Sequence, residues 1–278
     1  MITDAQVHIW HAETPDKPWP TGDARAAAHL PNGLEADEFI AKMDEAGVDR
    51  AVIVPPSWIG EDNSPGIEAG DLYPTRYAVM GRFDPREPNV TGRLEHWLEQ
   101  PHMLGIRMTL FRGFAAWLDD DTLTEFWPAC ERFGIPVMAL TPNTAAKLEP
   151  VAAKHPGLTL IMDHMAADLS AKGDKAFAEI GQLLSLAKYP NVYAKVSSAP
   201  CFSNEPYPFK DIEGYMRQIY DAYGPQRMMW GADYSRLTST YPECLAHFRD
   251  GLDFLTAEDK EWILGRTLAE ALKWPESK

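Results

Sequence analysis

The first side chains that could do chemistry stand in the stretch Asp4-Ala5-Gln6-Val7-His8. A β-strand alternates its two faces, so its carboxylate, amide and imidazole would share one face with the indole of Trp10. Such a face can hold a small molecule or exchange protons. A metal site would call for a second histidine at the position of Gln6.

Other polar side chains fall near the ends of apolar runs that we expect to be strands. They are Arg82 in YAVMGRFDP (77–85), Arg107 in GIRMTL (105–110), Asp163 and His164 in TLIMDHMA (159–166), Lys195 in NVYAKVSS (191–198), and Asp233 and Tyr234 in RMMWGADYS (227–235).

Each of these residues also has a structural interpretation. His164 can be a hydrogen-bonded core residue, Arg107 can pair with a structural carboxylate, and Lys195 can reach to a rim. We favour a helix-capping or supporting role over a catalytic one for Asp163. Polar residues at the ends of several different strands nevertheless favour a shared functional site.

The elements that must position these residues alternate along the chain. Strands are expected in the opening stretch and over 51–58, 77–85, 105–110, 135–141, 159–166, 191–198 and 227–235. Amphipathic patterns predict helices over 39–50, 93–100, 122–134, 145–157, 177–190, 211–225, 242–255 and 258–274. We expect the longest irregular stretches, 11–35 and 57–76, to form loops of the active-site face.

Eight strand–helix units in a chain of 278 residues indicate a (β/α)8 TIM barrel, with residues 1–278 as a single domain. A doubly wound sheet usually carries a glycine-rich loop after its first strand, and VHIWHAETP contains no glycine. In a barrel, the C-terminal ends of the strands surround the reaction site. Arg107 and Lys195 would point into its lumen, where an arginine is costly unless it meets an anion.

Composition excludes several classes of partner. The net charge of −15 argues against nucleic acid and anionic membranes, and no apolar run approaches the ~20 residues of a membrane span. Three widely separated cysteines fit reduced thiols, and the polar first twenty residues do not resemble a signal peptide. We expect a cytoplasmic protein with a small-molecule substrate and leave homo-oligomer formation open.

The motifs DAQVHIW, GIR, the DH of IMDHMA, NVYAKVS, MWGADY and ILGRTLAEALKW resemble the amidohydrolase superfamily. They are most similar to its amidohydrolase-related branch, which contains pyrone-dicarboxylate lactonase, sugar-acid lactonases, sulfomuconolactonase and galactarolactone isomerase. The motifs cover nearly the whole chain. The resemblance implies a TIM-barrel enzyme that acts on lactones or related substrates.

That family builds its site from an HxH motif on strand one, a histidine after strand six and an aspartate after strand eight. His8, His164 and Asp233 match this pattern, whereas Gln6 replaces the first histidine and the fifth strand has no histidine. An amide oxygen is a poor zinc ligand. We therefore expect no tightly bound metal, while a weakly bound divalent ion such as zinc would take His8, His164 and Asp233.

These residues predict a metal-independent lactonase. Asp233 would be the general base that activates water, His8 and His164 would donate hydrogen bonds to the carbonyl oxygen, and Gln6 would orient the carbonyl or the water. Arg107 would hold a substrate carboxylate, with Lys195 as a weaker candidate. Arg82, Tyr234 and Trp10 are further substrate-binding candidates.

Three other functions stay open. A lactone isomerase would use the same residues, a decarboxylase would need an intact HxH motif, and an inactive barrel would only bind a ligand. The loops over 11–35, 57–76, 111–121 and 199–210 would set specificity, with possible aromatic walls at Trp19, Trp58, Phe111, Phe114, Trp117, Phe202 and Tyr207.

Overall fold

The computed structural model describes residues 1–20 and 28–274. Within these residues, eight strands form one parallel sheet in sequential order. Their bounds are β1 (Thr3–Val7), β2 (Arg50–Ile53), β3 (Tyr77–Gly81), β4 (Met103–Thr109), β5 (Val137–Leu140), β6 (Leu160–Met162), β7 (Val192–Ser197) and β8 (Met228–Gly231). β8 returns to β1, where the Asp233 N–H donates to the carbonyl of Gln6 at 2.9 Å. The predicted TIM-barrel fold is confirmed.

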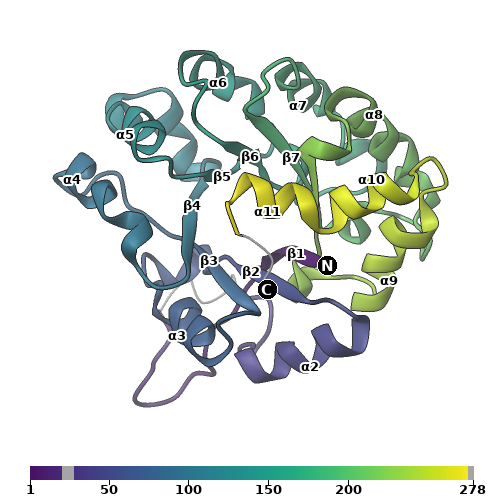
Figure 1. The fold of residues 1–278 in the computed structure, drawn as a ribbon, viewed down its shortest axis with the longest axis horizontal. Coiled ribbons are helices and arrows are strands. Elements are labelled where there is room, and N and C mark those ends of the chain that lie inside the picture. Colours follow the sequence, from purple (N-terminus) through teal and green to yellow (C-terminus); the bar gives the residue numbers. More distant parts are fainter. Residues whose placement is uncertain (21–27, 275–278) are drawn as a thin grey trace.

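Helices surround these strands as an outer ring (Figure 1). They are α2 (Ala36–Ala46), α3 (Ser64–Leu72), α4 (Val90–Glu95), α5 (Phe126–Phe133), α6 (Glu149–Lys154), α7 (Ile180–Leu186), α8 (Glu213–Tyr223), α9 (Tyr241–Ala246), α10 (Ala257–Glu261) and α11 (Thr267–Ala271). Short 3-10 turns follow several strands, as at Asp163–Ala166 and Tyr234–Arg236. The side chains of these turns lie at the C-terminal end of the barrel and do not follow the alternation of a strand.

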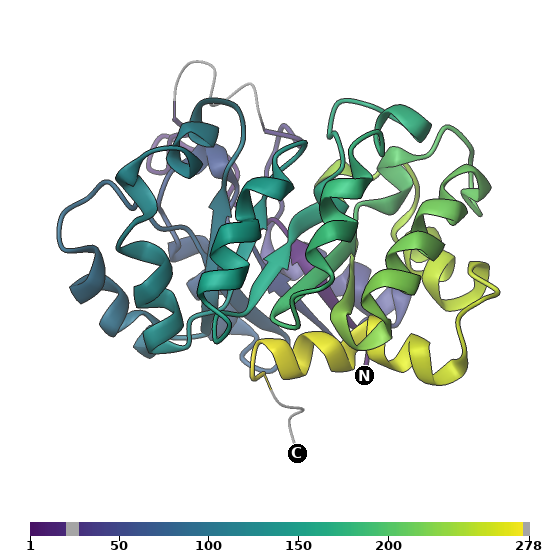
Figure 2. The ribbon, with the colours of Figure 1, turned by 90° about the horizontal axis from the view of Figure 1, so that it is seen from above.

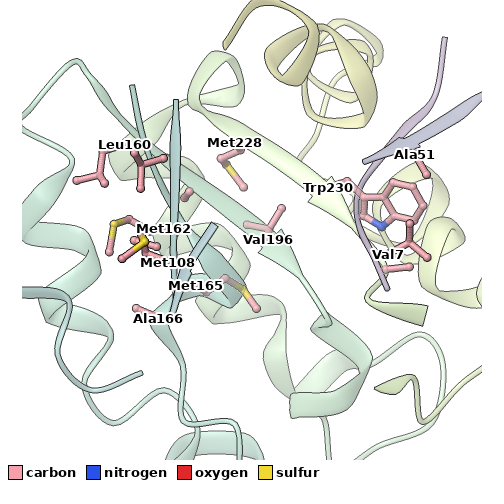
Figure 3. Packing of buried hydrophobic residues seen from close by; sticks show 14 of the residues in the cluster. Val7, Ala51, Met108, Leu160, Met162, Met165, Ala166, Val196, Met228 and Trp230 are labelled. Carbon is pink, nitrogen blue, oxygen red and sulfur yellow. The ribbon is translucent and has the colours of Figure 1, made fainter. Parts of the chain in front are cut away.

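The hydrophobic core lies between the strands and the surrounding helices. Val7, Ala51 and Trp230, from β1, β2 and β8, gather there on the outer face of the sheet (Figure 3). The alternating residues of β4 behave as predicted, since Ile106 and Met108 belong to this outer core. Arg107 therefore faces the lumen.

The N-terminal end of the barrel, opposite the C-terminal ends of the strands, is closed by the C-terminal helices. Figures 1 and 2 show α10 and α11 crossing the end at which the chain begins. Leu268 and Leu272 pack there with apolar lumen residues such as Ala5 and Met229. The loops that follow the strands lie at the other end, so the site has a single open side.

Two local predictions are wrong. The stretch 57–76 is not irregular, because it contains α3. Its sequence SPGIEAGDL has one proline and two glycines, which weaken the helical signal. Gly66 is buried, and a Cβ there would lie 3.2 Å from both Ile53 and Val79, so close packing selected a residue with poor helix propensity.

The second difference is a register shift in β1 between Asp4 and Val7. Such an irregularity breaks the alternation of side chains. Asp4 turns outward and accepts a hydrogen bond from the Tyr241 hydroxyl of α9 at 3.0 Å, while Ala5 faces the lumen. The predicted common face for Asp4, Gln6 and His8 is therefore wrong for Asp4.

No helix in the described part of the chain combines the length and the apolar character required to span a bilayer.

Candidate active site

A cavity of about 240 Å³ lies at the C-terminal end of the barrel. It combines three arginines, three histidines and a carboxylate with apolar walls. Its lining residues are His8, Trp10, His29, Pro56, Ser57, Trp58, Arg107, Phe111, Arg112, Leu140, His164, Leu169, Asp233 and Arg236. Five of the predicted site residues, His8, Trp10, Arg107, His164 and Asp233, thus meet around one space.

Asp233 lies two residues after the end of β8 and is fully buried. Its Oδ1 is 3.2 Å from His8 Nε2, and its Oδ2 accepts a hydrogen bond from the Ser198 hydroxyl at 2.9 Å. Burial alone would raise the pKa of this carboxyl group. The contact with His8 and the nearby His164 and Arg236 outweigh burial and hold the pKa well below its ordinary value. Asp233 is thus ionised near neutral pH and, taken alone, is a weak base.

His8 is held at both ring nitrogens. Nδ1 lies 2.5 Å from the carbonyl oxygen of Val54, which can only accept, so Nδ1 carries the ring hydrogen. Nε2 lies 3.2 Å from the amide nitrogen of Gln6 and 3.2 Å from Asp233 Oδ1. A neutral His8 ring therefore has its lone pair at Nε2, toward the Gln6 amide, whereas a ring that also carries a hydrogen at Nε2 donates to Asp233 Oδ1. The neutral ring accepts a proton and the protonated ring donates one, so the donor role predicted for His8 stays a prediction.

The orientation of Gln6 follows from its neighbour Lys195. The Lys195 ammonium donates to Gln6 Oε1 at 2.6 Å, and an ammonium has no acceptor. The amide NH2 group must therefore face His8. A glycine on β8 permits this placement, because a Cβ at Gly231 would lie 3.1 Å from the backbone nitrogen of Gln6 and 3.2 Å from its Cβ.

His164 lies on the other side of Asp233. Burial lowers the pKa of His164 to about 3, so its ring is neutral near pH 7. Nδ1 lies 2.8 Å from the Ser197 hydroxyl and Nε2 lies 3.8 Å from Asp233 Oδ2. Ser198 gives its hydrogen to Asp233, whereas Ser197 can donate to Nδ1 and leave the ring hydrogen on Nε2. This tautomer can donate to a substrate oxygen.

The backbone is strained at these strand ends. Three consecutive residues, His164, Met165 and Ala166, have φ angles of 50°, 60° and 52°, and Ser198 and Asp233 have 58° and 54°. The left-handed conformation costs a non-glycine residue about 1–3 kcal/mol. Strain at the ends of β6, β7 and β8 around one cavity is the pattern of a functional site.

An ion network lies under the cavity. Lys195 Nζ is 2.6 Å from Asp163 Oδ1, and Arg107 Nε is 3.1 Å from Asp163 Oδ2. Burial alone would raise the pKa of Asp163, but Lys195 and Arg107 outweigh it and keep the pKa below its ordinary value. Arg107 both pairs with a structural carboxylate and lines the cavity. Lys195 lies in the lumen as predicted, where it contacts Asp163 and Gln6 below the cavity and is not among the residues that line it.

Two other predicted substrate-binding residues lie outside this cavity. Arg82 is buried and donates to the Thr109 hydroxyl at 2.9 Å, beside a second cavity of about 190 Å³ that shares Arg107 and Ser57 with the first. Tyr234 packs its ring against Phe39 of α2, with centroids 5.3 Å apart. The position of Tyr234 therefore gives no support to a substrate-binding role.

Sequence reasoning missed His29, Arg112 and Arg236, which also line the cavity. They come from the segments after β1, β4 and β8, where no strand periodicity predicts direction. Burial lowers the pKa of His29 to about 4, and its Nδ1 lies 3.0 Å from the Ser235 hydroxyl. No pattern in the sequence distinguished these three residues from other loop residues.

Aromatic side chains form the walls, as expected of this fold's loops. Trp10 and Trp58 pack edge to face with centroids 6.0 Å apart, and Phe111 completes that part of the lining. Phe202 is instead a core residue and Tyr207 is 37% exposed. The other three expected wall residues line neighbouring cavities, namely Trp19, Phe114 and Trp117.

The donor set does not suit a tightly held divalent ion. Across residues 1–20 and 28–274, no group of three or more His, Cys, Asp or Glu side chains could hold a metal. The lone pair of His8 Nε2 faces the amide hydrogens of Gln6, and Arg236 Nη1 lies 3.6 Å from Asp233 Oδ2. A metal ligand would need both acceptors free of these hydrogens.

Comparisons with known proteins bear on the family. A sequence model of the Amidohydrolase family matches residues 3–273. A curated relative, the L-fucono-1,5-lactonase of Burkholderia ambifaria, is 28% identical over 248 residues, which cover 86% of this chain and 82% of the relative.

Two solved structures show the same fold. An amidohydrolase from Burkholderia multivorans with bound zinc has a TM-score of 0.80 at 21% identity, covering 99% of this chain and 100% of that one. A probable 2-pyrone-4,6-dicarboxylic acid hydrolase from Acinetobacter baumannii, with citric acid bound, has a TM-score of 0.75 at 18% identity. The alignment covers 98% of this chain and 99% of that structure.

Proposed function

The chain belongs to the amidohydrolase family, and we propose that it is a lactonase that opens a small lactone ring by general-base activation of water. One observation carries the proposal: the buried carboxylate of Asp233 lies 3.2 Å from the proton-accepting nitrogen of His8 in an arginine-lined cavity. The name of the relative from Burkholderia ambifaria supports a lactone as the substrate class.

Asp233 and His8 act together as the base. Asp233 alone is a weak base because its pKa is held low, whereas a proton placed between Oδ1 and Nε2 is shared by a carboxylate and an imidazole. Water adds its oxygen to the lactone carbonyl carbon as its proton passes to this pair. The ring C–O bond then breaks, and the leaving oxygen takes the proton back to give the hydroxy acid.

His164 stabilises the negative charge that develops on the carbonyl oxygen. Its neutral ring can present the hydrogen on Nε2 because Ser197 can donate to Nδ1 at 2.8 Å. A donor fixed before the reaction needs no reorganisation when the charge appears. His164 thus keeps the donor role, while His8 takes the role of acceptor.

Arg107 binds a carboxylate of the substrate or of the product. Its Nε is engaged by Asp163 and its Nη1 by Thr109, which fixes the plane of the guanidinium at the cavity wall. Arg112 and Arg236 add positive charge to the same space. We propose a carboxylated lactone as the substrate, with a neutral sugar-acid lactone as the alternative, since its hydrolysis also creates a carboxylate.

This scheme uses no tightly bound metal. The two groups that would have to serve as ligands already have other partners, since His8 Nε2 contacts the Gln6 amide at 3.2 Å and Asp233 Oδ2 lies 3.6 Å from the Arg236 guanidinium. The attacking water is activated by the carboxylate and imidazole instead.

The proposal is tested with a panel of sugar-acid, muconolactone-type and pyrone-type lactones, each followed by NMR of the product. We expect an open hydroxy acid from at least one of them. Asp233→Asn should lower kcat by about 10²–10⁴-fold without unfolding the protein, because the base is lost.

Asp221→Asn, at an exposed carboxylate that pairs with Arg217 on α8, is the matched control and should retain native turnover. An isomeric lactone as the product would establish ring migration in place of hydrolysis. Native turnover in Asp233→Asn would refute the proposed base.

A further inference from the structure

We propose that Lys195 is a positioning residue, which fixes the Gln6 amide so that its NH2 group, and never its oxygen, meets His8 Nε2. The inference rests on the proposed function, in which His8 accepts a proton together with Asp233. It assigns Lys195 a task that does not involve contact with the substrate.

The surroundings of Lys195 leave its ammonium few directions. The side chain is fully buried in the lumen, and Nζ lies 2.6 Å from Asp163 Oδ1, 2.6 Å from Gln6 Oε1 and 3.1 Å from the sulfur of Met138. All three are acceptors, which matches the three hydrogens of an ammonium. Each of the three ammonium hydrogens of Lys195 thus has an acceptor inside the barrel.

Gln6 needs such a partner because the two ends of an amide are nearly equal in shape. A glutamine between two polar groups can turn by 180° and exchange its donor for its acceptor. An ammonium makes only one of these orientations favourable, since it can only donate and its charge strengthens the bond. Lys195 therefore selects the orientation that a neutral neighbour would leave open.

The selected orientation decides what His8 presents to the cavity. With the amide hydrogen at Nε2 and the Val54 carbonyl at Nδ1, the ring has one hydrogen and one lone pair in defined places. A reversed amide would put Oε1 against Nε2 and would favour a hydrogen there. His8 would then lose the lone pair that accepts the proton of the reacting water.

Asp163 offsets the cost of burying the Lys195 ammonium. A buried ammonium is costly unless a carboxylate is beside it, and Asp163 is in turn paired with Arg107. One connected chain of contacts thus runs from Arg107 through Asp163, Lys195 and Gln6 to His8.

A double-mutant cycle tests the inference. Lys195→Met should lower kcat by about 10–100-fold with little change in KM, the usual range for a residue that orients a site residue. Gln6→Leu should lower kcat similarly. If Lys195 acts through Gln6, Lys195→Met should have little further effect in the Gln6→Leu background.

Met229→Leu is the matched control, because Met229 is a buried lumen residue opposite Lys195 in the β7–β8 register. It should leave kcat unchanged. Equal effects of Lys195→Met in both backgrounds would show that Lys195 serves only the stability of the barrel and would overturn the inference.

A spectroscopic readout separates this inference from the proposed reaction. In protein with ¹⁵N-labelled histidine, the His8 signals are assigned by their loss in His8→Asn. We expect a protonated Nδ1 and an unprotonated, hydrogen-bonded Nε2 at neutral pH. Lys195→Met and Gln6→Leu should both move the Nε2 signal, and Met229→Leu should not.

A protonated Nε2 in the native protein, or an unmoved signal in Lys195→Met, would overturn the inference even if lactones are hydrolysed. The expected spectra without turnover of any lactone would instead refute the proposed function and leave the role of Lys195 standing.

Discussion

Gln6 shows how much the meaning of one residue depends on its partner. The sequence places it where the related HxH motif has a histidine, and from that fact alone one could infer either a damaged chelate or a different design. The contact with Lys195 gives it a fixed donor side and a fixed acceptor side. An amide held in this way complements an imidazole base, which is a use of the position that needs no metal.

This chemistry leads to a prediction about metal removal. Because the Gln6 amide contacts His8 and the cationic Arg236 lies 3.6 Å from Asp233, dialysis against a chelator should leave kcat/KM unchanged. Activity is measured before and after dialysis, with metal analysis of both samples and a zinc-dependent hydrolase as the positive control. A loss of activity that zinc or manganese restores would contradict the prediction.

Some of the site residues could be predicted from the sequence and others could not. His8, His164 and Asp233 were predictable because they follow strand ends in a fold whose strand ends meet. His29, Arg112 and Arg236 were not, since the direction of a loop side chain depends on the tertiary path of that loop. The inward direction of Lys195 was predictable from strand alternation, whereas its contacts with Asp163 and Gln6 were not, because they depend on how the barrel closes.

At the scale of elements, the strands were predictable from their apolar alternation and the α3 helix was not. The strand β1 is instructive, because a single register shift turned Asp4 out of the lumen. Asp4 then became a link between three elements. Its Oδ1 accepts the N–H groups of Gln6 and Ala232 at 2.9 Å each, and its Oδ2 accepts the Tyr241 hydroxyl.

This link makes stability depend on pH. Burial raises the pKa of Asp4 from 3.8 to about 7, against the lowering effect of its hydrogen bonds. Between these values the folded protein holds a proton that the unfolded chain has lost, so this group's contribution to the free energy of unfolding falls as pH rises. The loss is on the order of 1 kcal/mol per pH unit and is complete above about pH 7.

Asp4→Asn resembles the protonated form and should remove this dependence. Urea unfolding of both proteins at pH 5 and pH 8 measures it, and Asn should gain stability relative to Asp as the pH rises. A difference between the two proteins that stays constant from pH 5 to pH 8 would contradict the prediction.

At the scale of the whole molecule, the barrel separates stability from activity. Its C-terminal end carries the charged cavity with the left-handed residues around it, whereas at its N-terminal end Leu268 of α11 packs against apolar lumen residues. Polar groups that cost stability are thus concentrated at one end, and the other end contributes apolar burial that offsets them.

Leu268→Ala tests this separation. The side chain is buried against the lumen residues, so its loss should destabilise the protein by about 2–5 kcal/mol. KM and kcat at 25 °C should remain native, because the cavity lies at the other end. Leu72→Ala, at a residue that is 66% exposed, is the control and should change stability by less than about 0.5 kcal/mol. A large change in KM for Leu268→Ala would contradict the separation.

The buried charges also constrain how such a protein can change over generations. Four residues are linked in this way: Arg107 of β4, Asp163 in the turn after β6, Lys195 of β7 and Gln6 of β1, and each neutralises or orients the next. A single replacement leaves a buried partner unpaired, whereas exposed loops tolerate exchange one residue at a time. New specificities are therefore most accessible through the loops, and anyone who grafts this lumen into another barrel will have to transfer the four residues together.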